Sequence, residues 1–82
     1  MNVDVVYHAF LREKLGRESE LLVVSGDRIT GATVLAAFVA AHPEMARLVN
    51  SLNIAVNDEI VSRDALFHEH DRIDILPPYG GG

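Results

Sequence analysis

The amino-acid sequence predicts an α+β fold in which one main helix packs across one mixed β-sheet. Apolar and polar residues alternate at both ends of the chain, over residues 2–10 and 72–76, as is typical of strands. A single stretch that begins at Thr33 has helical spacing instead. The expected order in this 82-residue chain is strand, strand, helix, strand, short strand and strand, which gives two layers.

The first strand is expected over residues 2–10, and one of its faces carries four apolar or aromatic side chains: Val3, Val5, Tyr7 and Ala9. Val6 and Phe10 on the opposite face predict a well-covered strand at the centre of the sheet. Residues 11–16 are expected to form a turn or a short helical loop that Gly16 closes. Residues 20–24 predict a second strand that pairs antiparallel with the first, because the connection between the two is short.

The main helix is predicted from four apolar residues at helical spacing: Val34, Leu35, Phe38 and Val39. Thr30 or Thr33 can cap its start. Pro43 marks its end, since a residue that precedes a proline is disfavoured in the helical region. Residues 43–49 indicate a further short turn of helix, with the proline in the first position, where it is tolerated.

The third strand is expected over residues 52–57, with Ile54 and Val56 on one face. Residues 57–58, Asn-Asp, tolerate positive φ and therefore predict a tight hairpin turn into a brief strand at residues 60–61.

Residues 62–70 are expected to form an irregular loop in which Leu66 and Phe67 pack against the domain. The last strand, residues 72–76, is predicted to bury its two isoleucines. Residues 1–76 should thus form one domain, followed by an extended C-terminal tail over residues 77–82.

That tail consists of Pro77, Pro78, Tyr79, Gly80, Gly81 and Gly82. Two consecutive prolines lack backbone donors, so they end a strand and hold the chain extended. Glycines have no Cβ and could enter a channel too narrow for any side chain. The carboxylate of Gly82, with a free-chain pKa of roughly 3.3 to 3.7, is ionised and unreactive until activated. Attack on the α-phosphate of ATP would give an acyl adenylate, which a sulfur nucleophile could convert into a thiocarboxylate. The alternative is a frayed chain end.

Composition limits the other possibilities. The chain contains no cysteine, which excludes disulfides, thiolate metal sites and a cysteine nucleophile. A net charge of −5 without a basic stripe argues against nucleic acid and favours a partner with a basic face. No apolar run approaches the ~20 residues that span a bilayer, and no targeting segment is evident, so we expect a soluble, cytoplasmic protein that does not bind membranes.

The histidines give little support for a metal site. His68 and His70 are two residues apart and would face the same way on a strand, but no third ligand is evident, so we expect a solvated pair and no metal. His8 and His42 have no partner recognisable from the sequence. No nucleophile with a local base is found either, which argues against an autonomous enzyme.

Several motifs in this order resemble the ubiquitin-like sulfur-carrier family, above all the small subunit of molybdopterin synthase (MoaD/ThiS-like). They are Val-Tyr-His-Ala-Phe-Leu-Arg-Glu at residues 6–13, Gly16, Thr33-Val34, His42-Pro43, Ala55-Val56-Asn57 and the whole of residues 72–82. The resemblance implies the β-grasp fold. Two positions depart from the family pattern: His70-Asp71 replaces a usual Gly-Asp, and Gly80 occupies a spacer position that more often carries a side chain.

The resemblance also implies partners. An adenylating enzyme similar to ubiquitin-activating enzymes would use ATP to activate Gly82, a persulfide would donate sulfur, and the charged tail would insert into the large catalytic subunit of molybdopterin synthase. The chain would then supply sulfur without being an enzyme on its own and without a permanently bound cofactor. Phe10, Leu76 and Arg12 are candidates for docking a partner, although the first two could equally be core residues and Arg12 could form a surface salt bridge.

Three functions remain open from the sequence. The first is a sulfur carrier for cofactor synthesis, with molybdopterin as the leading case and thiamine or cysteine as others. The second is a ubiquitin-like modifier attached to lysines of target proteins, or a carrier for tRNA thiolation. The third is a non-catalytic β-grasp interaction domain with an inert tail.

Overall fold

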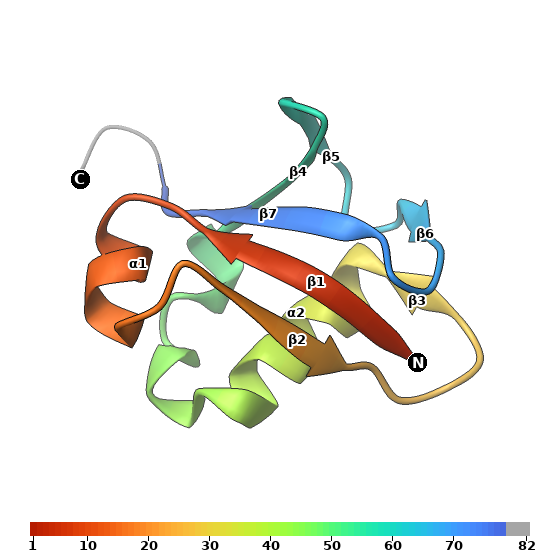
Figure 1. Cartoon of the computed structure of the whole chain (residues 1–82), viewed down its shortest axis with the longest axis horizontal. Helices are drawn as coiled ribbons and strands as arrows, with labels where there is room; N and C mark the ends of the chain where they lie inside the picture. Colours follow the sequence, from red (N-terminus) through yellow and green to blue (C-terminus); the bar gives the residue numbers. More distant parts are fainter. Residues whose placement is uncertain (79–82) are drawn as a thin grey trace.

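The computed structural model describes residues 1–78, which form a five-stranded mixed sheet crossed on one face by a helix (Figure 1). The predicted α+β class and order of the main elements are confirmed. The elements in chain order are β1 (Asn2–Tyr7), α1 (Phe10–Leu15), β2 (Ser19–Val23), β3 (Ile29–Thr30), α2 (Gly31–Ala41), the 3₁₀ turns η1 (Pro43–Met45) and η2 (Val49–Ser51), β4 (Asn53–Val56), β5 (Glu59–Val61), β6 (Leu66–Phe67) and β7 (Arg72–Leu76).

The main sheet has the strand order β2-β1-β7-β4-β5. The first and last strands, β1 and β7, pair in parallel near its centre, whereas all other pairs are antiparallel. The predicted hairpin of the first two strands and the central position of the first are thus confirmed. Because β1 and β7 run parallel, their carboxyl ends lie at the same end of the sheet, where α1 also lies (Figure 1).

The core lies between the sheet and α2. Its members from the two central strands are Val3, Val5, Tyr7, Ile73 and Ile75, and α2 contributes Val34, Leu35 and Phe38. All eight are at most 2% exposed. The predicted inward faces of both central strands are therefore confirmed, with the exception of Ala9, which lies beyond β1 and is exposed.

Both threonines predicted as candidate caps act together at the start of α2. Thr33 N–H donates to Thr30 Oγ1 at 3.1 Å, and Thr30 N–H donates to Thr33 Oγ1 at 2.8 Å, which forms a capping box. Gly31 is required next to them, because a Cβ there would lie 2.8 Å from the Cα of Arg63. The first turn of α2 is thereby pinned against the segment that precedes β6.

The first strand is shorter than predicted. Ala9 has φ 52° and ψ −133°, a conformation rare for residues with a Cβ, and it turns the chain directly into α1. Phe10 is consequently the first residue of α1 and is 39% exposed, instead of covering the far face of a strand. Gly16, with φ 70°, ends α1 as expected.

The loop predicted over residues 62–70 contains a strand that the sequence did not reveal. Leu66–Phe67 pairs with Ile29–Thr30 in a separate two-stranded sheet, and strands of two residues are too short to show alternation. Phe67 packs against the core as predicted, but Leu66 is 65% exposed.

Both faces of β4 are covered. Ile54 is buried, yet Ala55 is buried as well, while Val56 is only half-buried. Ala55 lies between Asp74 of β7 and Ile60 of β5 on the face away from α2, and these larger neighbours cover it. The predicted Asn-Asp turn is confirmed, with φ 52° and 67° at its two residues.

The turn before β7 keeps a conformation suited to glycine although it contains His70. His70 has φ 71°, and its N–H donates to Asn2 O at 2.7 Å. A Cβ in this left-handed region costs about 1–2 kcal/mol, which exceeds the roughly 0.5–1 kcal/mol entropic cost of glycine.

We therefore expect His70→Gly to raise the free energy of unfolding by about 0.5–1 kcal/mol in urea titrations. His68→Gly is the matched control: His68 lies in the same turn but is not among the residues with positive φ, so this change should lower stability. Equal destabilisation by both changes would contradict the proposed strain at His70.

Candidate functional site

The candidate site is the surface from which the tail begins. β7 ends at Leu76, and Pro77 and Pro78 follow it as half-buried, non-strand residues, consistent with prolines that end a strand. Tyr79, Gly80, Gly81 and Gly82 lie outside the described residues, so the roles predicted for them stay predictions. The structure defines the surroundings in which the tail starts.

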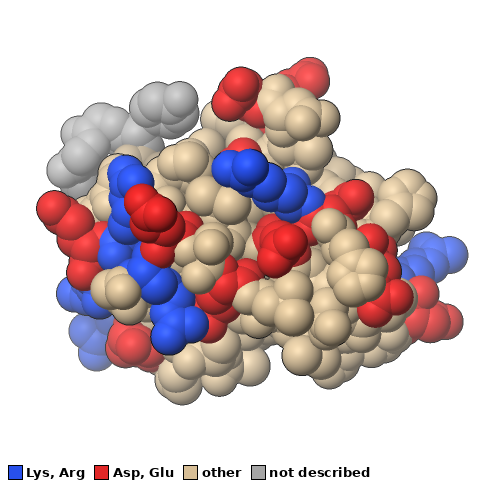
Figure 2. All heavy atoms as spheres, viewed as in Figure 1, with Lys and Arg blue, Asp and Glu red and all other residues tan. Residues whose placement is uncertain are grey.

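Alternation along β7 directs Ile73 and Ile75 to the core and the side chains between them to the open face of the sheet. On that face Leu76 lines a shallow groove of about 560 Å³. The other lining residues are His8, Ala55, Asp58, Glu59, Ile60 and Asp74. Ile60 is 49% exposed, so the groove offers an apolar centre with acidic residues around it. Acidic side chains are visible at the tip of the β4–β5 hairpin in Figure 2.

A second groove, of about 490 Å³, adjoins the first on the same face. It is lined by Asp4, Val6, Tyr7, His8, Arg12, Glu18, Ser19 and Arg72. His8 belongs to both grooves, and its Nε2 lies 3.0 Å from Oδ1 of Asp74. His8 thus has a partner that the sequence did not reveal. Figure 2 shows basic side chains gathered mainly on the left of the view, with acidic side chains next to them.

The three predicted docking residues occupy different places. Leu76 lines the first groove, Arg12 lines the second, and Phe10 is exposed on α1 but lines neither. The core alternative is therefore wrong for Phe10. Arg12 forms an exposed pair with Glu18 at 3.4 Å, and such pairs contribute only about 0–1 kcal/mol.

The groove residues that sequence reasoning missed are Ile60, His8 and Asp74. Alternation placed Ile73 and Ile75 inward, so the same rule would have placed Asp74 outward with Leu76. Ile60 could have been recognised as the apolar residue that follows the hairpin turn in an edge strand.

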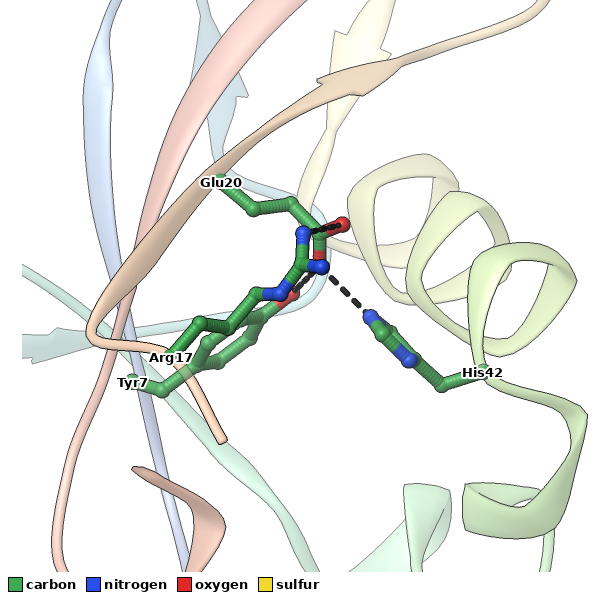
Figure 3. Close-up of polar contacts among 4 residues, drawn as sticks. All are labelled: Tyr7, Arg17, Glu20 and His42. Atoms are coloured by element: carbon green, nitrogen blue, oxygen red, sulfur yellow. Dashed lines mark hydrogen bonds and ion pairs between the residues drawn. The ribbon is translucent and has the colours of Figure 1, made fainter. Parts of the chain in front are cut away.

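A cluster of polar side chains lies on the opposite side of the sheet, between β2 and the end of α2 (Figure 3). Glu20 accepts hydrogen bonds from three groups: Tyr7 Oη at 2.5 Å, His42 Nε2 at 2.6 Å and an Arg17 guanidinium nitrogen at 2.9 Å. The side chains of Glu20 and His42 are only 13% and 14% exposed. His42, which ends α2, thus has a partner that the sequence did not reveal.

This cluster stabilises the fold. Burial and the hydrogen bond to Glu20 raise the pKa of the Tyr7 hydroxyl well above its ordinary value, so Tyr7 remains a donor. Burial alone would raise the pKa of the Glu20 carboxyl, but hydrogen bonds from His42 and Tyr7 and the charges of His42 and Arg17 lower it overall. The ionised carboxylate joins β1, β2 and the end of α2.

The other predicted histidine pair does not form a recognisable site. His68 Nδ1 lies 3.8 Å from Asp71 Oδ2, and both side chains are exposed. Among residues 1–78, no group of three or more His, Cys, Asp or Glu side chains could hold a metal ion. Within the same residues, no helix has the length and apolarity needed to cross a membrane.

The Glu20 cluster predicts a pH dependence of stability. A carboxyl whose pKa is lower in the folded state stabilises the protein above its unfolded pKa of about 4.3, and this contribution is lost as pH falls through the folded pKa. Between about pH 5 and pH 3, the stability advantage of the wild type over Glu20→Gln should therefore shrink in urea unfolding. Glu18→Gln, at an exposed carboxylate, is the control and should follow the wild type. Parallel profiles for the wild type and Glu20→Gln would contradict the expected role of the carboxylate.

The chain is similar in sequence to a known protein family and to a named relative. Residues 5–82 match the model of the ThiS family. The chain is similar to the molybdopterin synthase sulfur carrier subunit of Chlamydomonas reinhardtii, with 32% identity over 85 residues and all of both chains covered.

Two solved structures show the same architecture. SAMP1 from Haloferax volcanii superposes with a TM-score of 0.78 at 26% identity, with 100% of both chains covered. The complex of subunits 1 and 2 of the molybdopterin-converting factor from Helicobacter pylori contains a chain with the same fold, with a TM-score of 0.62 at 20% identity and 100% of both chains covered. The family match spans nearly the whole chain, and we conclude that this protein belongs to the ThiS family, as a sulfur carrier with the ubiquitin-like β-grasp fold.

Proposed function

We propose that this chain carries sulfur for molybdopterin synthesis, as the small subunit of a molybdopterin synthase. The observation that carries the proposal is the full-length similarity to a molybdopterin synthase sulfur carrier subunit, together with the terminal Gly81-Gly82. In this proposal the domain presents the tail to its partner enzymes, and the carboxyl end of the tail carries the sulfur.

The proposed chemistry takes place at the carboxyl group of Gly82. Its oxygen attacks the α-phosphate of ATP in an adenylating enzyme, which releases pyrophosphate and leaves an acyl adenylate. A persulfide sulfur attacks the acyl carbon and displaces AMP, and reductive cleavage of the S–S bond by a thiol leaves the thiocarboxylate. A large catalytic subunit then directs this sulfur to a pterin precursor. ATP is a substrate of the activating enzyme, and activation is expected in the cytoplasm.

The groove beside the start of the tail supports docking of a protein partner. Its apolar centre is formed by Ile60, Leu76 and Ala55, with the acidic residues Asp58, Glu59 and Asp74 around it. This pattern fits a partner that presents an apolar side chain among arginines or lysines. We propose this groove as the main contact with the large subunit, with Arg12 and the exposed Phe10 as secondary contacts. The related fold in the Helicobacter pylori complex of two subunits is consistent with such an assembly.

A second candidate function is protein modification. The relative SAMP1 is described as a small archaeal modifier protein, and its structure is as similar in fold as that of any molybdopterin protein compared. A modifier would use the same Gly82 adenylate and pass the acyl group to a lysine amine instead of accepting sulfur. Sulfur transfer to tRNA, thiamine or cysteine would also start from this intermediate.

Deletion of Gly82 should abolish activation while leaving the fold intact, because the new terminal carboxylate, that of Gly81, would end one residue short of the position that the adenylating enzyme acts on, and the core lies within residues 3–75. The full chain, incubated with an adenylating enzyme, ATP and a persulfide donor, should gain the mass of one oxygen exchanged for sulfur. The shortened chain should gain none and should keep its unfolding midpoint. Sulfur uptake by the shortened chain would contradict the requirement for Gly82, and conjugates on other proteins would favour the modifier role.

Truncation of the groove should weaken docking without affecting activation chemistry. Leu76→Ala and Ile60→Ala should each raise the Kd for the large subunit by about tenfold or more, because apolar contacts at the centre of an interface dominate binding. Val23→Ala, at a 70% exposed residue that does not line this groove, is the control and should leave the Kd unchanged by calorimetry. Equal effects of all three changes would exclude the groove as the docking site.

A further inference from the structure

One edge of the main sheet is formed by β2, a five-residue strand whose outer side pairs with no other strand among residues 1–78. Leu21 and Val23 on this strand are 55% and 70% exposed. Natural edge strands are commonly protected by lysine, proline or a bulge, and the sequence Ser-Glu-Leu-Leu-Val contains neither of these residues. The edge is therefore available for pairing.

The backbone of β2 alternates between its inner and outer partners. Glu18 O accepts from Tyr7 N–H at 2.8 Å, and Val24 N–H donates to Met1 O at 2.7 Å, so the even-numbered residues of this segment direct their backbone groups to β1. The odd-numbered residues Ser19, Leu21 and Val23 must then direct theirs away from the sheet.

These outward groups are arranged symmetrically about Leu21. We propose that two copies of this chain pair through β2 as antiparallel strands, with Leu21 opposite the partner's Leu21 and Ser19 opposite the partner's Val23. Each of these pairs exchanges two backbone hydrogen bonds, and the exposed Leu21 and Val23 side chains meet across the ladder. The contact is isologous, as expected for a two-fold dimer, and it joins the two sheets into one.

The charges and shape at this edge permit the pairing. The one charged residue of β2, Glu20, faces α2 and is already paired with His42 and Arg17, so it adds no repulsion to the new ladder. On the helix side, a shallow groove of about 250 Å³ beside Val23 is lined mainly by small side chains, which leave room for the second copy: Ser25, Thr33, Ala36, Ala37 and Ala40. The net charge of −5 on each copy opposes association, so the dimer should become more stable as salt increases.

The pairing would leave the first groove free, whereas Ser19 also lines the second groove. The groove with Ile60 and Leu76 belongs to β5, β4 and β7, whereas β2 is the strand at the opposite edge. Because the two β2 strands run antiparallel, the two β7 strands do so as well, and the two tails begin at opposite ends of the joined sheet. This inference does not depend on the proposed function.

The absence of native cysteine allows a direct test of the register. Leu21→Cys should form a disulfide-linked dimer under mild oxidation, because Cα atoms of a hydrogen-bonded pair lie about 5.5 Å apart, within disulfide range. Ser19→Cys should not couple to itself, since the two copies of that residue would be about 13 Å apart. It should couple to Val23→Cys when the two variants are mixed. Ile60→Cys, on the other edge of the sheet, is the exposed control.

Sedimentation equilibrium tests the association without a cross-link. Leu21→Pro removes only an outward-facing N–H and should preserve the β1 ladder, yet it should weaken dimerisation at least about tenfold, as should Val23→Lys. Ile60→Lys should have no effect. Dimers of Leu21→Cys that form no faster than those of Ile60→Cys, or a wild type that stays monomeric at millimolar concentration and high salt, would overturn the proposal. A monomeric wild type would indicate instead that a strand from another protein pairs with the outer side of β2.

Discussion

The parallel pairing of β1 with β7 is the constraint on which the rest of the structure depends. It places the first and last strands side by side near the centre of the sheet, with Val5 next to Ile73 and Tyr7 next to Ile75. Parallel neighbours require a long crossover, and here the crossover supplies α2, which covers the inner face of both strands. The strand that leads into the tail is thus fixed by neighbours on both sides, and a pull on the tail would act on the most buried part of the sheet.

The cluster around Glu20 lies at the edge of the same core, between β2 and the end of α2. Tyr7 is only 1% exposed, and its hydroxyl reaches the Glu20 carboxylate that also binds His42 at the end of α2. The Tyr7 ring lies 5.6 Å from that of Phe38, centroid to centroid, so one residue serves both the apolar core and the polar cluster. Every buried side-chain nitrogen or oxygen among the described residues has a hydrogen-bond partner, which is why the polar cluster does not weaken the core.

The sequence predicted the elements whose signals are local and repeated. Alternation indicated β1 and β7, and Thr30, one of the two candidate caps, is the N-cap of α2. Prediction from the sequence failed for the strands β3 and β6, because two residues are too short to show alternation. It also failed for the end of β1, which is set by the backbone conformation of Ala9.

The candidate site was predicted only in part, for a related reason. Leu76 was recognised because it stands next to the tail in the sequence. The contacts His8–Asp74 and Glu20–His42 join residues 66 and 22 positions apart, and only the folded chain brings them together. Ile60 and Leu76 likewise line one groove only because β4 lies between β5 and β7, and a single sequence does not specify this order of the strands.

The alternation along β7 has a consequence for how a sulfur carrier with this fold could come to bind new partner enzymes. Ile73 and Ile75 are committed to the interior, whereas Asp74 and Leu76 face outward and are free of that commitment. Under the proposed docking through the groove, stability of the fold and selectivity for a partner are encoded by separate residues of one short segment. Substitutions at the outward positions would then change which enzyme binds the carrier while the inward isoleucines keep the fold unchanged, so one scaffold could serve several pathways.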